Sequence, residues 1–347
     1  MLRVFTSPEL LFIKTFLWPA LSILGSSQIF LTISVSLFVD DAASCDGPIS
    51  PNEVHAALLG MAKGKSPGSD GLQVEFRVAF WDLRSGDLVN VFNASLEAGL
   101  PPFSQSEALI ALIFKKGGRL DHKNWRPISL LNGDYKLCAH VLAGRLLKVI
   151  ATVVAPDQTC GVPGCYIGEN VAFLRDLLEL ANEYNLPVAL LSLYQEKAFD
   201  HVDWPFLFAT LAKMGVGESF IRWVRRLYTD VRSSVLVIGY TCRSRPFKPS
   251  RRMCQGCPLS PLLYVLSMEV LTANVRCHPD ITGRRLPGLS SPLPVLSLYA
   301  DDTFAVSFSD RATRAIFLVY GRFEQGSSAK LNLGKCKGVW FGSWRGR

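Results

Sequence analysis

Apolar residues recur along this chain with two different periods, and the period predicts which segments are helices and which are strands. Helical spacing of apolar residues marks 134–154, 168–185 and 310–324. Short apolar runs typical of strands occupy 109–114 and 188–193. The run at 188–193 is apolar throughout, so we expect it to be buried on both faces of a sheet. Strands and helices mix without a regular βαβ alternation, which predicts an α+β fold whose antiparallel sheet is backed by helices.

Local signals add the positions of further elements. The stretch SPNE at 50–53 is a capping box with proline at the first helical position, and it predicts a helix that starts at 51. A helical region is expected over about 75–98. Two strand-like runs, VRSSVLVIGY and CRSRPF, predict a hairpin over 231–247.

The start of the chain has a different texture. Residues 15–39 carry no charged side chain, which is long enough to cross a bilayer. Serine, threonine and glutamine are frequent there, however, and apolar residues alternate with polar ones over 29–39, which is strand periodicity. Three interpretations stay open: a membrane segment, a strand, or a stretch that never belonged to the domain that follows.

Composition and charge limit the function classes. The 347 residues are enough for two or three domains, and 49% of them are hydrophobic, so a sizeable core can be buried. The net charge of +8 suits a polyanionic partner, and the excess is uneven. Between residues 222 and 252 nine basic residues face one acid, Asp230, which indicates either a solvated surface or a phosphate-binding track.

The nine cysteines are odd in number and scattered. Only Cys254 and Cys257 stand close together, in a C-x-x-C pattern. Without a second pair or a metal-spaced histidine, this pattern does not favour a zinc or redox site. We therefore expect reduced thiols of the kind found in intracellular proteins.

The stretch SLYADDTFAVSF, 297–308, places Asp301 and Asp302 at the predicted tip of a hairpin. Nucleotidyl transfer gives such a pair a role, because carboxylates that bridge two divalent ions hold the attacking and leaving oxygens in line. Adjacent aspartates between strands are, on the other hand, common as plain turn residues. The metal interpretation therefore needs a third carboxylate on a neighbouring strand.

A series of stretches, in the same order along the chain, resembles the motifs of the reverse transcriptase domain of non-LTR (LINE-type) retrotransposons. They are KGKSPGSDGL, NWRPISLL, QEKAFD, QGCPLSPLLY, YADD, KLNLGKCKG and VWFGSW. The resemblance implies a right-hand polymerase fold with palm and fingers and with the thumb missing. It divides the chain into a hydrophobic segment of unclear origin (1–44), fingers and part of the palm (45–187), and palm with the catalytic hairpin and a primer-grip-like end (188–347).

The resemblance also implies roles for individual residues. Asp301 and Asp302 would bind Mg²⁺ or Mn²⁺, and Lys335 would donate a proton to pyrophosphate. Phe199 would be the steric gate that excludes a ribose 2′-hydroxyl. The implied nucleotide-binding residues are Lys115, Lys116, Arg126, Phe199, Gln255 and Gly256. The basic stretch would hold the nucleic-acid backbone through Arg222, Arg225, Arg226, Arg251 and Arg252.

The implied partners are an RNA template, a DNA primer and deoxynucleoside triphosphates, with no firm protein partner. The implied location is intracellular, in the nucleus or the cytoplasm. Within the polymerase class, telomerase and group II intron enzymes are the runners-up. The agreement over QEKAFD and WRPISLL favours the non-LTR elements.

The pattern breaks at the position of the family's first catalytic aspartate, which here is Tyr194. A phenol offers one weak ligand instead of two charged oxygens, so the Mg²⁺ or Mn²⁺ site is expected to be weakened or lost. Glu196 and Asp200 follow nearby, but the family carries acids at both positions alongside its catalytic aspartate. We therefore predict an impaired or inactive RNA-directed DNA polymerase, with a non-catalytic RNA or RNA–DNA hybrid binding remnant as the alternative.

Three further departures from the family pattern replace arginine. Cys254, Cys165 and His201 stand where the family usually has arginine. Changes from arginine to cysteine and histidine are those that methyl-CpG decay makes in arginine codons, so we hypothesise a decaying genomic copy. Its codons at these positions should be TGY and CAY, and a closely related copy should carry CGY there.

Overall fold

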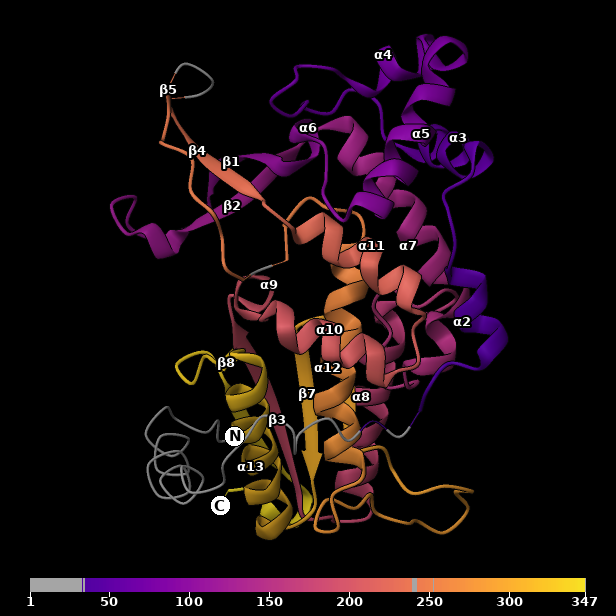
Figure 1. Cartoon of the computed structure of the whole chain (residues 1–347). Coiled ribbons are helices and arrows are strands. Elements are labelled where there is room, and N and C mark those ends of the chain that lie inside the picture. Colours follow the sequence, from indigo (N-terminus) through magenta and orange to yellow (C-terminus); the bar gives the residue numbers. More distant parts are fainter. Residues whose placement is uncertain (1–32, 34, 239–241, 252, 347) are drawn as a thin grey trace. The chain divides into compact units, whose positions relative to one another are not determined.

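The structure, a computed structural model, describes residues 33, 35–238, 242–251 and 253–346 (Figure 1). The described residues form two compact units, each assembled from separate parts of the chain. Unit 1 contains the residues up to Ser36, Ile150–Met214 and those from Tyr264 onward. Unit 2 contains Leu37–Val149 and Gly215–Leu263.

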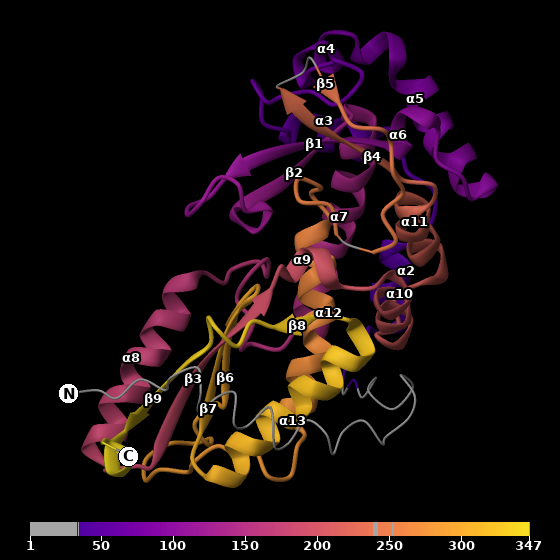
Figure 2. The same cartoon turned by 90° about the vertical axis from the view of Figure 1, so that its left-hand side faces the viewer.

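Unit 1 is built around one antiparallel sheet with helices on both faces. Its strands are β3 (Val188–Glu196), β6 (Leu296–Tyr299), β7 (Asp302–Ser307), β8 (Lys330–Leu331) and β9 (Lys337–Phe341). Its helices are α8 (Ile167–Glu183), α9 (Ala198–His201), α10 (Trp204–Lys213), most of α12 (Ser260–Arg276), α13 (Asp310–Ser327) and the 3₁₀ turn η4 (Gly342–Trp344). The strand order is β6-β7-β3-β8, and β9 also pairs with β3. Helix α8 lies along one face of the sheet and α13 along the other (Figure 2).

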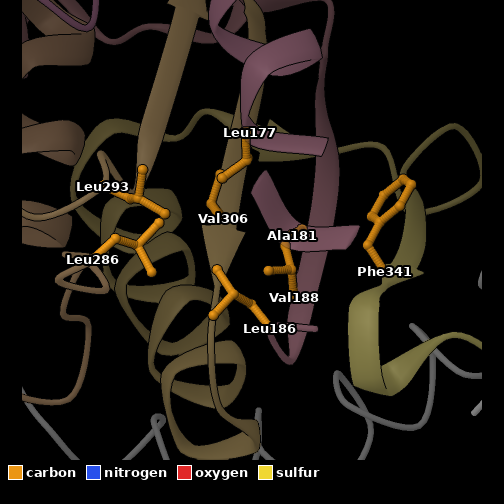
Figure 3. Packing of buried hydrophobic residues seen from close by; sticks show 8 residues of the cluster. All are labelled: Leu177, Ala181, Leu186, Val188, Leu286, Leu293, Val306 and Phe341. Atoms are coloured by element: carbon orange, nitrogen blue, oxygen red, sulfur yellow. The ribbon is translucent and has the colours of Figure 1, made fainter. Parts of the chain in front are cut away.

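The alternation of side chains along β3 explains why helices pack on both faces of this sheet. Val188 points to the face that α8 covers, where it joins Leu177 and Ala181 of α8 and Val306 of β7 in one apolar cluster (Figure 3). The next residues of β3 alternate between the faces, because successive side chains of a strand point to opposite sides. Burial of both faces is what an uninterrupted apolar run predicts, and it places β3 in the middle of the sheet.

Unit 2 contains a second sheet, of order β2-β1-β4-β5. Its strands are β1 (Glu107–Phe114), β2 (Trp125–Leu131), β4 (Arg232–Ile238) and β5 (Cys242–Arg243). Its helices are α2 (Val39–Cys45), α3 (Pro51–Gly60), α4 (Val74–Ala79), α5 (Trp81–Ala98), α6 (Phe103–Ser106), η3 (His122–Asn124), most of α7 (Gly133–Val153) and α11 (Glu218–Tyr228). Strands β1 and β2 form an antiparallel hairpin, and β4 pairs with β1 in parallel.

Most predicted elements are present with small shifts of their ends. The capping box is confirmed: Ser50 accepts a hydrogen bond from the backbone of Glu53, and the Glu53 side chain accepts one from the backbone of Ser50. The helical region predicted over 75–98 is two helices, because the backbone leaves helical geometry at Phe80, where Trp81 stacks on His55. The parallel pairing of β1 with β4 was not expected from the sequence.

Strand β3 is three residues longer than the apolar run predicted, and this matters for the site. Of the three extra residues, Tyr194 pairs with β7, while Gln195 lies opposite Leu331 and Glu196 opposite Lys330 of β8. Glu196 was expected possibly past the end of the strand, and it is the last residue of β3. All nine cysteines are free thiols.

The uncharged stretch predicted at 15–39 lies mostly outside the described residues. In the part of the chain that the structure describes, no helix combines the length and apolar character needed to span a membrane.

Candidate active site

The Asp-Asp pair lies at a tight hairpin in unit 1, as the pattern of 297–308 predicts. Strand β6 ends at Tyr299, β7 begins at Asp302, and these two residues face each other in the antiparallel register. Only Ala300 and Asp301 remain to make the turn, and Ala300 has the left-handed φ of 54° that such two-residue turns require. Asp301 is therefore held at the tip of the turn, and Asp302 is exposed at the start of β7.

A buried glutamine fixes this turn, and no pattern along the chain pointed to it. Gln158 is only 2% exposed. Its Oε1 accepts a hydrogen bond from the backbone N–H of Ala300 at 3.0 Å, and its Nε2 donates to the Ala300 carbonyl at 3.5 Å. The neighbouring backbone pairs with β6, since Thr159 donates its N–H to the Leu298 carbonyl. Gln158 thus positions the tip on which Asp301 sits, through the backbone of Ala300.

The third position of the expected carboxylate set is occupied by Tyr194, next to Asp302. In the register of β3 and β7, Tyr194 pairs directly with Asp302. Directly opposed residues of an antiparallel pair lie on the same face with their Cβ atoms about 5 Å apart. Tyr299 faces Asp302 from the other side. Asp302 therefore stands in a row between two phenol side chains.

Lys335 lies against the ring of Tyr194. Its Nζ is 4.6 Å from the ring centroid, within the range of a cation–π contact. The loop that carries Lys335 is tied to the backbone of Tyr194: Asn332 donates its N–H to the Tyr194 carbonyl at 2.8 Å, and the Tyr194 N–H donates to Cys336 Sγ at 3.3 Å. The structure thus brings Lys335 to the Asp302 row, with its charge facing the phenol ring.

The side chains around this hairpin do not fit a two-metal carboxylate site. Two-metal nucleotidyl transfer needs carboxylates that bridge the ions, yet among the described residues no group of three or more His, Cys, Asp or Glu could hold a metal ion. Glu196 lies on the same face of β3 as Tyr194 but two residues farther along, which is about 7 Å of strand. Its register partner is Lys330. Among the described residues, the hairpin therefore supplies two adjacent carboxylates, and a phenol stands at the position expected to carry the third.

Phe199 is the predicted gate residue, and a second aromatic residue holds its ring. Lys197 adopts a left-handed conformation after β3, and this bend turns the chain into the short helix α9 that carries Phe199. The half-buried ring of Phe199 stacks on Tyr264 of α12, with centroids 4.7 Å apart and planes 23° from parallel. The Tyr264 hydroxyl donates to Gln195 Oε1 at 3.4 Å. Tyr264 is fully buried, which raises its pKa well above the usual value.

The predicted nucleotide-binding residues outside unit 1 gather around β2 in unit 2. Arg126 is exposed on β2 opposite Ile113, and Lys115 and Lys116 follow the end of β1. The Gln255 carbonyl accepts a hydrogen bond from the N–H of Ser129 on β2 at 2.8 Å. Gly256 follows with φ +115°, and a Cβ there would lie 2.6 Å from the Ser129 carbonyl oxygen. Glycine is therefore required by this close approach of the 255–256 turn to β2.

The predicted nucleic-acid contacts of the basic stretch need one correction. Arg222 and Arg225 are exposed on α11, and Arg251 is exposed after β5, so these three can face solvent partners. Arg226 is only 1% exposed, and its guanidinium donates to Ser95 at 2.5 Å and to Gln105. The prediction that Arg226 binds a nucleic-acid backbone is wrong, because its side chain links α11 to α5 and α6. Arg252 lies outside the described residues.

Comparison with known proteins identifies what the chain is similar to. Residues 113–343 match the family model of reverse transcriptase (RNA-dependent DNA polymerase). The chain is 38% identical over 304 residues to a transposon TX1 uncharacterized 149 kDa protein of Xenopus laevis, covering 85% of this chain and 22% of that protein. It is 27% identical over 263 residues to a retrovirus-related Pol polyprotein from type-1 retrotransposable element R2 of Popillia japonica, covering 76% and 35%. It is 28% identical over 265 residues to a probable RNA-directed DNA polymerase from transposon BS of Drosophila melanogaster, covering 74% and 27%.

Proposed function

Because this chain belongs to the reverse transcriptase (RNA-dependent DNA polymerase) family, with relatives from non-LTR retrotransposons, we propose that it is such a polymerase domain with impaired catalysis. The proposal covers the partners as well: an RNA template, a DNA primer and deoxynucleoside triphosphates. The chain spans well under half the length of the curated relatives it matches. We assign the palm to the sheet that carries the Asp-Asp hairpin, and the fingers to the sheet that carries Arg126. The finer boundaries at 45, 188 and 347 stay a prediction.

One observation carries the proposal of impairment: Tyr194 is the register partner of Asp302. Nucleotidyl transfer by two divalent ions depends on carboxylates that bridge them and offset their charge. At this position the chain offers a phenol ring, and the ring is in contact with the ammonium of Lys335. The Lys335 ammonium would disfavour a divalent cation beside Asp302, because like charges repel. Removal of several kcal/mol of transition-state stabilisation slows a reaction by about a thousandfold or more.

The residues that survive would still recognise the nucleotide. An exposed guanidinium such as that of Arg126 suits a triphosphate, because its planar fork donates two parallel hydrogen bonds to phosphate oxygens. Phe199 would contact the sugar, and its stacking on Tyr264 would fix the position of the Phe199 ring. Tyr264 is in this sense a positioning residue for the gate. Gly256 would allow close approach of the backbone to a base.

The test is primer extension on an RNA template with Mg²⁺ and with Mn²⁺. We expect no extension by the natural chain and extension by Tyr194→Asp, because aspartate restores a carboxylate next to Asp302. The matched control is Tyr194→Asn, which removes the ring and has the shape of aspartate but not its charge, and we expect it to stay inactive. Equal extension by the natural chain and Tyr194→Asp would contradict the proposal. Extension by Tyr194→Asn would show that the ring, and not the missing charge, is the obstacle.

A second candidate function, binding of RNA or RNA–DNA hybrid without extension, is favoured by the exposed arginines of α11. Arg222 and Arg225 are exposed, while the rest of the helix buries Phe220 and Trp223. This separation leaves a basic face on a firmly packed helix. Each phosphate contact makes the slope of log affinity against log salt more negative by about 0.7 to 0.9.

Fluorescence anisotropy of a labelled RNA–DNA hybrid over a series of salt concentrations tests this binding. The double variant Arg222→Gln/Arg225→Gln should make this negative slope less steep by about 1.4 to 1.8. The control Arg175→Gln changes an exposed arginine of α8 that pairs with Asp176, and it should leave the slope unchanged. An unchanged slope in the double variant would remove these two residues from the binding surface.

A further inference from the structure

We propose that a cavity in unit 2 binds a single unstacked nucleotide, holding its base against an apolar wall and its phosphate at a basic rim. The cavity has a volume of about 460 Å³, which is in the range of small-molecule sites. It is bordered by the loop after α3, by one face of α7 and by the turn at Gly256–Pro258. This inference rests on the proposed function for its source of nucleotides. Of the residues assigned to nucleotide binding above, the lining of this cavity includes Gly256, and its basic side chains are others.

The walls of the cavity are held in place before any ligand arrives. Asn132 fixes the loop side: its Oδ1 accepts a hydrogen bond from the N–H of Asp70 at 3.2 Å, and its Nδ2 donates to the Ser104 carbonyl at 2.6 Å. Gly68 packs so closely on Asn132 that a Cβ would lie 2.0 Å from its Oδ1. The opposite side is fixed by the hydrogen bond between Ser129 and Gln255. Preformed walls reduce the ordering cost of binding.

The lining has the chemistry of a nucleotide site. Its apolar wall is formed by Pro67, Leu72, Val74, Leu131, Pro258 and Pro261. Such a surface suits the flat face of a base, since every base has a face that stacks on apolar or aromatic groups.

The polar side of the lining is basic. Lys136 and His140 are four residues apart on α7, so they project from the same face, and Lys65 lies on the loop. Among the described residues that line the cavity, none is aspartate or glutamate. The nearby carboxylate of Asp70 is paired with Arg77 at 2.9 Å.

The half-buried positions of the α7 residues strengthen this complementarity. Burial lowers the pKa of Lys136, although the charge of Asp70 opposes this. The Lys136 ammonium therefore lacks part of its hydration and would gain from a further anionic partner. Burial and the charge of Lys136 lower the pKa of His140. A neutral imidazole at pH 7 can donate one hydrogen bond and accept another, which suits the edge of a base. A phosphate near Lys136 and a base near His140 would satisfy both.

The same ligand chemistry has two sources, a free nucleotide or an unpaired base of a bound template strand. The binding experiment uses the full chain and titrates AMP, GMP, CMP and UMP, with inorganic phosphate as a separate ligand, by calorimetry at low salt. We expect the mononucleotides to bind and Lys136→Gln to weaken them about tenfold, the effect of one charge-assisted phosphate contact. The matched control is Lys148→Gln, an exposed lysine of the same helix outside the lining, which should bind like the natural chain.

Two results would overturn the site. Equal weakening by Lys136→Gln and Lys148→Gln would show a general charge effect. Inorganic phosphate binding as tightly as the mononucleotides would show that no base is recognised. As a second variant, Leu72→Trp fills the mouth of the cavity from an exposed position and should abolish nucleotide binding while the thermal unfolding midpoint stays unchanged.

Competition separates the two sources, and also separates this inference from the proposed function. AMP is displaced with a single-stranded RNA oligonucleotide and with the same oligonucleotide lacking one base. Far better displacement by the intact oligonucleotide assigns the cavity to a template base. Equal displacement by both assigns it to free nucleotides. If mononucleotides do not bind in the cavity, the proposed function still holds when Leu72→Trp keeps hybrid binding through Arg222 and Arg225. If the chain binds no hybrid, the cavity assignment still holds when mononucleotides bind.

Discussion

Each unit contains a carboxylate that is paired with a buried or half-buried arginine. The pKa values of these two carboxylates are shifted in opposite directions. In unit 2, burial works to raise the pKa of Glu53, but hydrogen bonds from Arg145 and Ser50 outweigh it and bring the pKa down to about 2. In unit 1, burial dominates and raises the pKa of Glu269 to about 7, although Arg276 opposes this. The same pair of chemical groups therefore stabilises the two units in different pH ranges.

The difference comes from how many charges share one guanidinium. Arg145 serves a single carboxylate, to which it donates at 2.6 and 2.9 Å, and its other N–H groups reach the carbonyls of residues 45 to 48. Arg276 is divided between Glu269 and Asp157, and the charge of Asp157 adds to the burial of Glu269. Two carboxylates and one arginine leave an excess negative charge in a dry environment, which favours protonation.

The position of each pair shows what it supports. Arg145 of α7 holds the segment between α2 and α3, so it fixes the start of unit 2. Glu269 and Arg276 of α12 hold the segment that leads to Gln158: Glu269 accepts from the N–H of Ala155 at 3.5 Å, and Arg276 donates to Asp157 at 2.8 Å. Because Gln158 fixes the turn at Ala300, the second pair supports the Asp-Asp hairpin indirectly.

The largest effect is expected from Arg145→Ala. The change leaves Glu53 with the hydrogen bonds from Ser50 but without its guanidinium partner, and it removes the donor to the carbonyls of residues 45 to 48. Removal of one partner of a buried ion pair costs about 3 to 5 kcal/mol. Urea unfolding measures the loss, with Lys148→Ala, an exposed lysine of the same helix, as the control that should change stability little. A loss no greater than in the control would mean that water replaces Arg145 and that the pair is not what fixes this segment.

An intermediate effect is expected from Glu269 as a function of pH. Its folded pKa of about 7 lies above the ordinary value of 4.5, so the folded state binds more protons between these values. The contribution to stability is fully present below pH 4.5 and is lost as the pH rises through 7, on the order of 3 kcal/mol in total. Urea unfolding at pH 5, 6, 7 and 8 should show this fall in the natural chain and a flatter profile in Glu269→Gln. Parallel profiles would contradict the assignment to Glu269.

The smallest effect is expected from Glu53, in the opposite direction. Its folded pKa of about 2 lies below the ordinary 4.5, so its stabilisation is present above pH 4.5 and is lost as the pH falls towards 2. Its side chain is 31% exposed, and after allowance for screening by solvent we expect about 1 to 2 kcal/mol. Acid unfolding is monitored by circular dichroism. The loss of stability between pH 4.5 and 2 should be smaller in Glu53→Gln than in the natural chain, and it should be unchanged in Glu269→Gln.

The failed prediction at Arg226 shows which signals a sequence carries and which are easily passed over. Counting charges placed Arg226 with its neighbours Arg222 and Arg225 in one basic stretch. Helical periodicity separates them, because Arg226 lies three residues after Trp223 and shares its buried face. The signal was present in the spacing, and a reading of the helix face would have found it.

Gln158 and Tyr264 could not have been found in this way. Gln158 acts on Ala300, which is 142 residues away along the chain. Tyr264 stacks on Phe199, which lies on a different element. Neither residue belongs to a repeating pattern or a charged cluster, and a contact across such a separation is decided by how the strands and helices pack. The same holds for the cavity in unit 2, whose wall and rim come from three separate segments.

The sequence by itself determined the family, the order of the motifs, the helix and strand types and the hairpin that presents Asp301 and Asp302. These depend on local periodicity, on turn chemistry and on residue identity, all of which can be read along a chain. It also determined that a tyrosine replaces an expected aspartate. Only the tertiary structure decided that Tyr194 faces Asp302, that Lys335 lies on its ring and that Gln158 holds the turn at Ala300. Register and side-chain contacts of this kind join segments far apart in sequence, and local patterns do not encode them.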